Sequence, residues 1–109
     1  MPSHPPPILA LPERVDTWSI QKVEEAFFSQ QLEPGDYAIL DFGQTAFVSS
    51  SGIRFLLIAS DRLRKNGGGD VLLAGMQPSV LSVLEICNLD KRFQIFDSVH
   101  AAQQFCGNA

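Results

Sequence analysis

The sequence has few basic residues and no cluster of them large enough for a nucleic-acid surface. It contains eight Lys and Arg against twelve Asp and Glu among 109 residues, for a formal net charge of −4. Nucleic-acid binding needs clustered Lys and Arg to neutralise phosphates. The one basic group, Arg62, Arg64 and Lys65, stands where a helix is expected to end, and positive charge there suits the helix dipole. We therefore expect no nucleic acid among the partners.

Long apolar runs, paired cysteines and clustered histidines are also missing. No apolar stretch approaches the roughly 20 residues that cross a bilayer, and the start of the chain, MPSHPPPILA, lacks the basic and apolar segments of a signal peptide. Cys87 and Cys106 form no CxxC spacing, and His4 and His100 are isolated. We expect no metal site and no cofactor. These absences favour a cytoplasmic protein that keeps its thiols reduced and does not insert into a membrane.

What is present suits one small globular domain. Hydrophobic residues make up 45% of the chain and charged residues 18%, and a chain of this length can bury a single core. The first seven residues, MPSHPPP, predict a stiff proline-rich arm. We expect residues 1–7 to form this arm and residues 8–109 to form the domain.

Strand and helix signals alternate four times along the domain. Apolar runs predict strands over residues 8–11, 37–42, 71–76 and 94–96, with residues 46–48 continuing the second of them. Helical spacing predicts helices that begin near Asp16 or Ser19, at Ser51, at Pro78, and after Asp97 or Ser98. The second of these helices is expected to end in a left-handed cap at Asn66 and Gly67. This order predicts a single α/β domain with a mostly parallel sheet of about four strands and four helices.

Three consecutive serines stand at one junction of this pattern. In FVSSSGIRFLLIAS, residues 47–60, Ser49, Ser50 and Ser51 follow a strand and begin a helix. Ligands and chemistry in open α/β sheets usually lie at this edge, and a helix N-terminus stabilises a phosphate, whether bound or attached to a serine. One serine is explained as a helix cap with Gly52 allowing close packing, but a cap does not require three.

Catalytic and phosphate-binding alternatives have little support at this junction. The GxSxG pattern of a hydrolase nucleophile is absent, and neither histidine stands in a motif that marks a base. The phosphate-loop pattern GxxxxGK[ST] is also absent. We therefore expect no catalytic residues and no enzyme activity. A serine phosphorylated by another protein remains, because the stretch offers an accessible hydroxyl at a helix start.

The chain resembles the STAS domain of bacterial anti-sigma factor antagonists over about nine-tenths of its length. The family pattern has a strand with L-D, an apolar pair, D-S-S-G-L, and later G-L-x-x-x-F. Its places are taken here by Leu40–Asp41, Phe47–Val48, Ser50–Ser51–Gly52–Ile53 and Leu89–Phe93. Three places differ: Ser49 stands where the family has aspartate, Asn88 replaces a glycine, and one N-terminal strand is expected where relatives have two.

The resemblance implies a regulated binding module in transcription control rather than an enzyme. Relatives bind an anti-sigma factor that is also a serine-protein kinase of the histidine-kinase-like ATPase type, and a serine phosphatase reverses the phosphorylation. The phosphorylated serine corresponds to Ser50, with Ser51 as second choice. The expected partner-binding residues are Phe47, Ser49, Ser50, Ser51, Gly52, Ile53, Arg54 and Leu57. A monomer or weak dimer is expected.

The sequence leaves two other functions open. Some family members accompany membrane transport ATPases without being phosphorylated. The absence of the aspartate before Ser50 favours this function as a transporter subunit. Others have been suggested to bind purine nucleotides, although this chain offers no phosphate loop. An exposed Ser50 with a small apolar rim of Phe47, Ile53 and Leu57 would favour the phosphorylation switch.

Overall fold

The structure is a computed structural model that describes residues 5–65 and 68–107. Its main sheet has the order β1-β3-β5-β6, and every strand pair in it is parallel. These strands are β1 (Ile8–Ala10), β3 (Tyr37–Asp41), β5 (Asp70–Ala74) and β6 (Gln94–Phe96). Four helices accompany them: α1 (Ile20–Phe28), α2 (Ser50–Arg64), α3 (Pro78–Ile86) and α4 (Val99–Gly107). The predicted α/β class, with a four-stranded parallel sheet and four helices, is confirmed.

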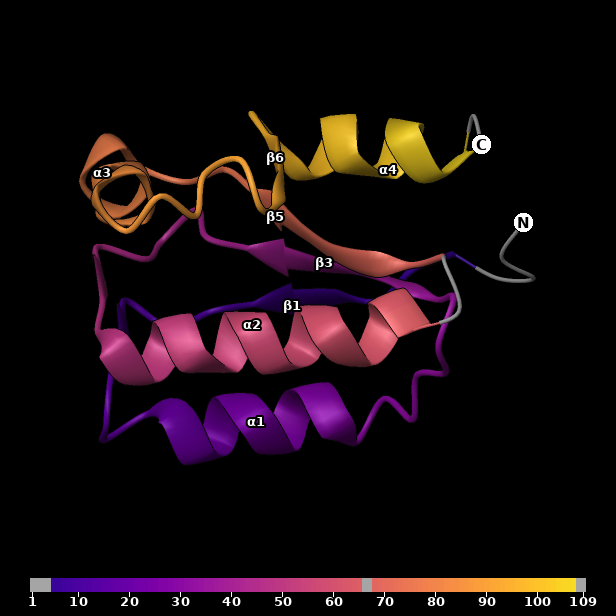
Figure 1. Ribbon diagram of the computed structural model, residues 1–109, viewed down its shortest axis with the longest axis horizontal. Coiled ribbons are helices and arrows are strands. Elements are labelled where there is room, and N and C mark those ends of the chain that lie inside the picture. The colour runs from indigo at the N-terminus through magenta and orange to yellow at the C-terminus, as the bar shows by residue number, and fades with distance from the viewer. Residues whose placement is uncertain (1–4, 66–67, 108–109) are drawn as a thin grey trace.

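Helices cover both faces of the sheet, as Figure 1 shows, with α1 and α2 on one face and α4 on the other. The central strands β3 and β5 are apolar along their length because both of their faces are buried. In β5, Val71 and Leu73 face the larger core under α1 and α2, whereas Leu72 and Ala74 face the smaller core under α4. The period of two in a strand produces this division.

A second, two-stranded parallel sheet was not predicted. Its strands are β2 (Arg14–Val15) and β4 (Phe47–Val48), and Val15 lies opposite Val48. The sequence predicts that residues 46–48 continue the strand of residues 37–42, and this is wrong. Asp41 instead accepts the N–H of Gly43 on Oδ1, at 2.9 Å, and the chain turns before β4 begins. The N-terminal part of the described chain therefore supplies two short strands rather than one.

Some sequence predictions lie at or beyond the limits of the described residues. Ile39 donates its N–H to the carbonyl of Pro7 at 2.9 Å, and Pro5–Pro7 have no regular secondary structure. The division of the chain at residue 8 stays a prediction. The C-cap predicted at Asn66 and Gly67 lies outside the described residues.

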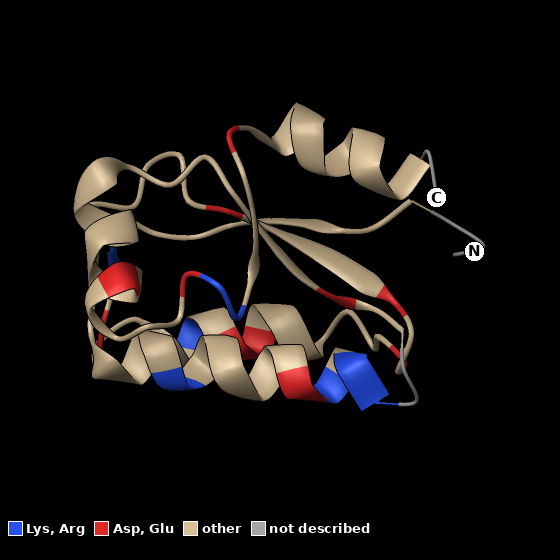
Figure 2. Ribbon diagram, turned by 45° about the horizontal axis from the view of Figure 1, so that its top comes forward, with Lys and Arg blue, Asp and Glu red and all other residues tan. Residues whose placement is uncertain are grey.

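The basic residues Arg62, Arg64 and Lys65 end α2, at the opposite end of that helix from Ser50 (Figure 2). Both cysteines are free; Cys87 is exposed, and burial raises the pKa of the Cys106 thiol. Within the described ranges, no helix combines the length and apolar character that a membrane span requires.

A polar network at the amino end of the sheet ties α2 to β5. The buried hydroxyl of Ser60 donates to Asp70 Oδ1 at 2.6 Å and accepts a hydrogen bond from Arg92 at 2.9 Å. Asp70 Oδ1 also accepts the N–H of Val71 at 2.7 Å. This buried carboxylate is therefore compensated by hydrogen bonds, as a buried charge must be.

We expect Ser60→Ala to lower the free energy of unfolding by about 1–3 kcal/mol, because Asp70 and Arg92 each lose a partner inside the protein. Urea denaturation measures the change. Ser82→Ala is the matched control, since Ser82 is exposed and bonds only within its own helix, to Pro78. Equal stabilities of the two variants would contradict the structural importance of this network.

Candidate functional site

The serine stretch lies where β4 ends and α2 begins. Ser49 is the N-cap of α2, and its N–H donates to the carbonyl of Val15 at 2.8 Å. Its own carbonyl accepts the N–H of Ile53 at 3.0 Å, the first bond of the helix. The start of α2 is therefore attached to β2 by the backbone, and the β2–β4 pairing decides where the serines lie.

The three serines have different environments. Ser49 Oγ is buried and has no hydrogen-bond partner among the described residues, and it does not cap the helix. Ser51 is half-buried, whereas Ser50 is exposed at the first position of α2. Within the described part of the chain, no hydrogen bond engages the Ser50 hydroxyl. Ser50 is thus the serine that another protein can reach.

Gly52 is buried and holds α2 close to the small sheet. A Cβ atom at this position would lie 2.6 Å from Val48 Cγ1, 2.9 Å from Val15 Cγ1 and 3.1 Å from the Val15 carbonyl oxygen. Any larger residue would push the first turn of α2 away from β2 and β4. Gly52 was expected among the partner-binding residues, and the structure places it underneath that surface.

The other expected partner-binding residues differ in how far they are exposed. Phe47 is exposed by 41%, and Arg54, one helical turn beyond Ser50, is also exposed. Ile53 and Leu57 are partly buried and pack against the larger core. The apolar rim predicted around Ser50 is therefore carried mainly by Phe47, with Ile53 and Leu57 contributing only part of their surface.

Two residues that the sequence did not single out extend this region. The guanidinium of Arg14 lies 4.3 Å from the centre of the Phe47 ring and 3.2 Å from Asp16 Oδ2. Trp18, the only tryptophan, is 94% exposed. Both come from the segment around β2, which reaches the start of α2 through the pairing of Arg14 with Phe47.

The turn that carries Trp18 is held by Asp16. Asp16 Oδ1 accepts the N–H groups of Trp18 at 3.0 Å and Ser19 at 3.2 Å, and Ser19 Oγ accepts the N–H of Asp16 at 3.1 Å. Desolvation acts to raise the pKa of Asp16, but hydrogen bonds from Arg14, Ser19 and Trp18 and the Arg14 charge together lower it. Asp16 is therefore ionised at neutral pH, and Trp18 projects from an ordered turn.

We call the exposed side chains at this edge the Ser50 surface: Arg14, Trp18, Phe47, Ser50 and Arg54. Trp18 was missed because a lone aromatic residue before a helix has no periodic signal of its own. Its position inside the D-x-x-S turn, with a polar residue on each side, is the signal that could have marked it as exposed.

The histidine that the structure describes lies away from Ser50. His100 lies in α4, on the opposite face of the sheet from α2 (Figure 1), so it cannot act as a base on Ser50. Within residues 5–65 and 68–107, no three His, Cys, Asp or Glu side chains come together as metal ligands.

Comparisons with known proteins agree on one family. The model of the STAS domain matches residues 2–102. A Bordetella bronchiseptica protein named "Putative anti-sigma factor antagonist BtrV" is 32% identical over 79 residues, which cover 72% of this chain and 67% of that protein.

We expect Gly52→Ala to destabilise the protein despite the better helix propensity of alanine. The added methyl overpacks the contact with Val15 and Val48, which costs about 1–3 kcal/mol, against a gain of up to about 1 kcal/mol from propensity. Gly107→Ala in α4 is the control, because a Cβ there meets no atom of the described residues within 4 Å. If denaturation shows Gly52→Ala to be as stable as Gly107→Ala, the close approach of α2 to β2 is wrong.

Proposed function

Because the chain belongs to the STAS domain family, we propose that it is a protein-binding module of a partner-switching pathway, controlled by phosphorylation of Ser50. The proposed partner is an anti-sigma factor that is also a serine-protein kinase of the histidine-kinase-like ATPase type. A serine phosphatase would restore the unmodified form. In this role the protein acts in the bacterial cytoplasm, regulates transcription and catalyses no reaction itself.

The observation that carries the proposal is the exposed and unbonded hydroxyl of Ser50 at the first position of a helix. The aligned peptide dipoles stabilise a negative charge there by about 0.3–1 kcal/mol, so the fold tolerates a phosphate. Arg54, exposed one turn later, supplies a positive charge near the same helix start.

The same phosphate would oppose partner binding. It adds about −1.5 to −2 charges in the middle of the Ser50 surface. A partner that covers Phe47 and Trp18 would have to desolvate that charge, and an uncompensated buried charge costs several kcal/mol. The modification therefore has a small effect on folding and a large one on association, as a switch requires.

Ser49 bears on how the kinase would recognise this chain. Relatives carry an aspartate there, and Ser49 contributes a buried hydroxyl instead of a carboxylate beside the acceptor. A phosphorylated Ser50 therefore requires a kinase that does not depend on that carboxylate. A STAS subunit that docks on a transport ATPase without being modified is the alternative, and the phosphorylation experiment distinguishes the two.

We expect one phosphate, on Ser50, after incubation of the protein with ATP and a lysate of its own host. Intact-mass spectrometry with peptide mapping locates it. Ser50→Ala should abolish labelling, and Ser98→Ala, which changes an exposed serine at the start of α4, should not. Absence of label on Ser50 in a lysate that labels other proteins would refute the switch and favour the transporter-type subunit.

Binding to the purified kinase should follow the charge at residue 50. We expect Ser50→Asp to weaken binding at least about tenfold, or about 1.4 kcal/mol, and Ser50→Ala to bind like the unmodified protein. Ser98→Asp adds the same charge at another helix start on the opposite face, and calorimetry should show it to be neutral. Equal loss for both aspartate variants would show that net charge, not the Ser50 surface, is responsible.

Trp18 offers a direct measure of which surface the partner covers. As the sole tryptophan, 94% exposed, it should shift its fluorescence emission to shorter wavelength when the kinase buries it. Tryptophan is enriched among residues that dominate binding energy, so we expect Trp18→Ala to weaken binding at least about tenfold, with unfolding unchanged. Ile8→Ala, at the other end of the sheet, is the control. Binding without an emission shift would place the partner elsewhere.

A further inference from the structure

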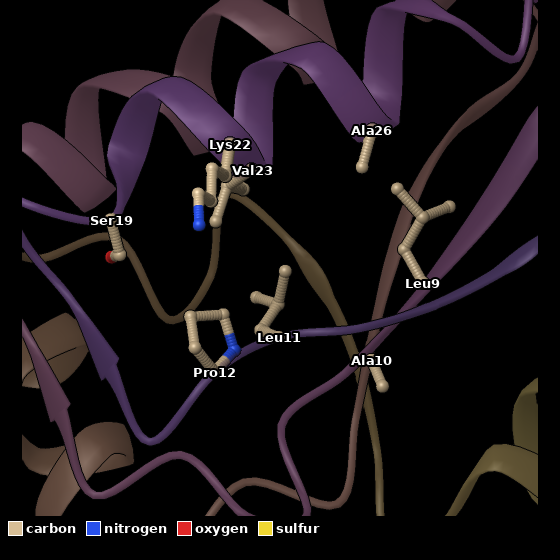
Figure 3. A pocket seen from close by; sticks show the side chains of 8 residues that line it. All are labelled: Leu9, Ala10, Leu11, Pro12, Ser19, Lys22, Val23 and Ala26. Atoms are coloured by element: carbon tan, nitrogen blue, oxygen red, sulfur yellow. The ribbon is translucent and has the colours of Figure 1, made fainter.

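A groove of about 180 Å³ lies between α1 and the edge strand β1 (Figure 3), and none of its lining residues belongs to the Ser50 surface. β1 and the residues after it provide one wall, and the first two turns of α1 provide the other. Leu9 and Leu11 point toward α1, whereas the side chain of Ala10 points away from it, and Ala26 leaves space on α1 because its side chain is small (Figure 3). Its lining residues are Leu9, Ala10, Leu11, Pro12, Ser19, Lys22, Val23 and Ala26.

Most polar groups of this lining are already bonded within the protein. Leu11 donates its N–H to the Asp41 carbonyl and accepts a hydrogen bond from Gln44 at 2.9 Å, and the Pro12 carbonyl accepts one from Thr45 at 2.8 Å. Ser19 Oγ donates to the Arg14 carbonyl at 2.6 Å. A ligand in this groove therefore meets apolar walls.

Lys22 is the exception. Its side chain lines the groove from α1, as Figure 3 shows, and it forms no ion pair or hydrogen bond with any other described residue. A lysine ammonium is a compact point charge with three donors. The groove thus combines an apolar space with a single uncompensated positive charge at its edge.

An added β-strand is a poor occupant for this edge. β1 has only three residues, and prolines stand before it at Pro7 and after it at Pro12. Short edge strands bounded by proline resist pairing with another chain. A doubly charged phosphate is also a poor fit, because the walls offer no backbone N–H cluster to satisfy its oxygens.

We propose that this groove binds small carboxylic acids, with the apolar body between α1 and β1 and the carboxylate paired with Lys22. Its volume is close to that of the roughly 150 Å³ protein cavity known to hold benzene, and below the range of drug-sized sites. The site therefore takes a ligand of about the size of benzoate. It does not depend on the proposed function of Ser50.

The test is a titration of the whole protein with benzoate, and with benzyl alcohol as the neutral counterpart of similar size, at neutral pH and constant ionic strength. Amide chemical shifts measured by NMR report the site. We expect saturable benzoate shifts confined to the amides of residues 9–11 and 19–26, with a Kd on the order of 1 mM. Benzyl alcohol should bind about two- to fivefold more weakly, the effect of one exposed ion pair.

Two variants test separately the contributions of the Lys22 charge and of the apolar volume of the groove. Lys22→Gln should bring benzoate binding down to the level of benzyl alcohol, and Ala26→Leu should abolish binding of both by filling the groove. Lys91→Gln, which removes an exposed charge elsewhere, should change neither. Absence of saturable shifts at the groove would overturn the site. Equal binding of the two probes, or benzoate affinity unchanged in Lys22→Gln, would overturn the assignment of a carboxylate ligand.

Discussion

The site depends on the attachment of the first turn of α2 to the small β2–β4 sheet. The Ser49 N–H bonds to the Val15 carbonyl, and Gly52 lets the helix approach Val15 and Val48 within van der Waals contact. This contact buries Gly52 and the hydroxyl of Ser49 and leaves Ser50 as the first exposed position of the helix. It also brings the turn after β2, with Trp18, to the same edge. A backbone hydrogen bond and the absence of one methyl group thus determine which of three serines is accessible.

The rest of the fold makes that attachment rigid. α2 lies on the central strands with Phe55, Leu56, Ala59 and Leu63 buried, and its far end is fixed by the bond from Ser60 to Asp70. Because the helix is held at both ends, α2 would not shift its position in response to a phosphate on Ser50. Its charge would instead be presented to whatever covers the surface. On the proposed function, a rigid helix start would let phosphorylation change binding without a change in fold.

The two candidate binding regions differ in the physics that each would use. The Ser50 surface carries exposed aromatic rings with two arginines, features suited to a protein partner. The groove beside Lys22 is small and apolar with one charge, features suited to a small acid. The two regions are neighbours in the sequence, since the Asp16 turn that positions Trp18 leads directly into α1, whose first two turns line the groove. The network at the amino end of the sheet belongs to neither and serves stability.

The order of strands and helices was determined by the sequence itself, because apolar runs, helical spacing and turn residues act over a few neighbouring positions. The same local signals placed Ser50 at a helix start, and the motif spacing indicated the family. The tertiary structure alone decided that residues 46–48 leave the main sheet to pair with β2, that Gly52 lies underneath the surface, and that Trp18 joins Ser50 at one edge. Those outcomes depend on contacts between segments about 30 residues apart, such as Arg14 with Phe47. Local pattern carries no information about them, since their free energy comes from packing that exists only once the chain has folded.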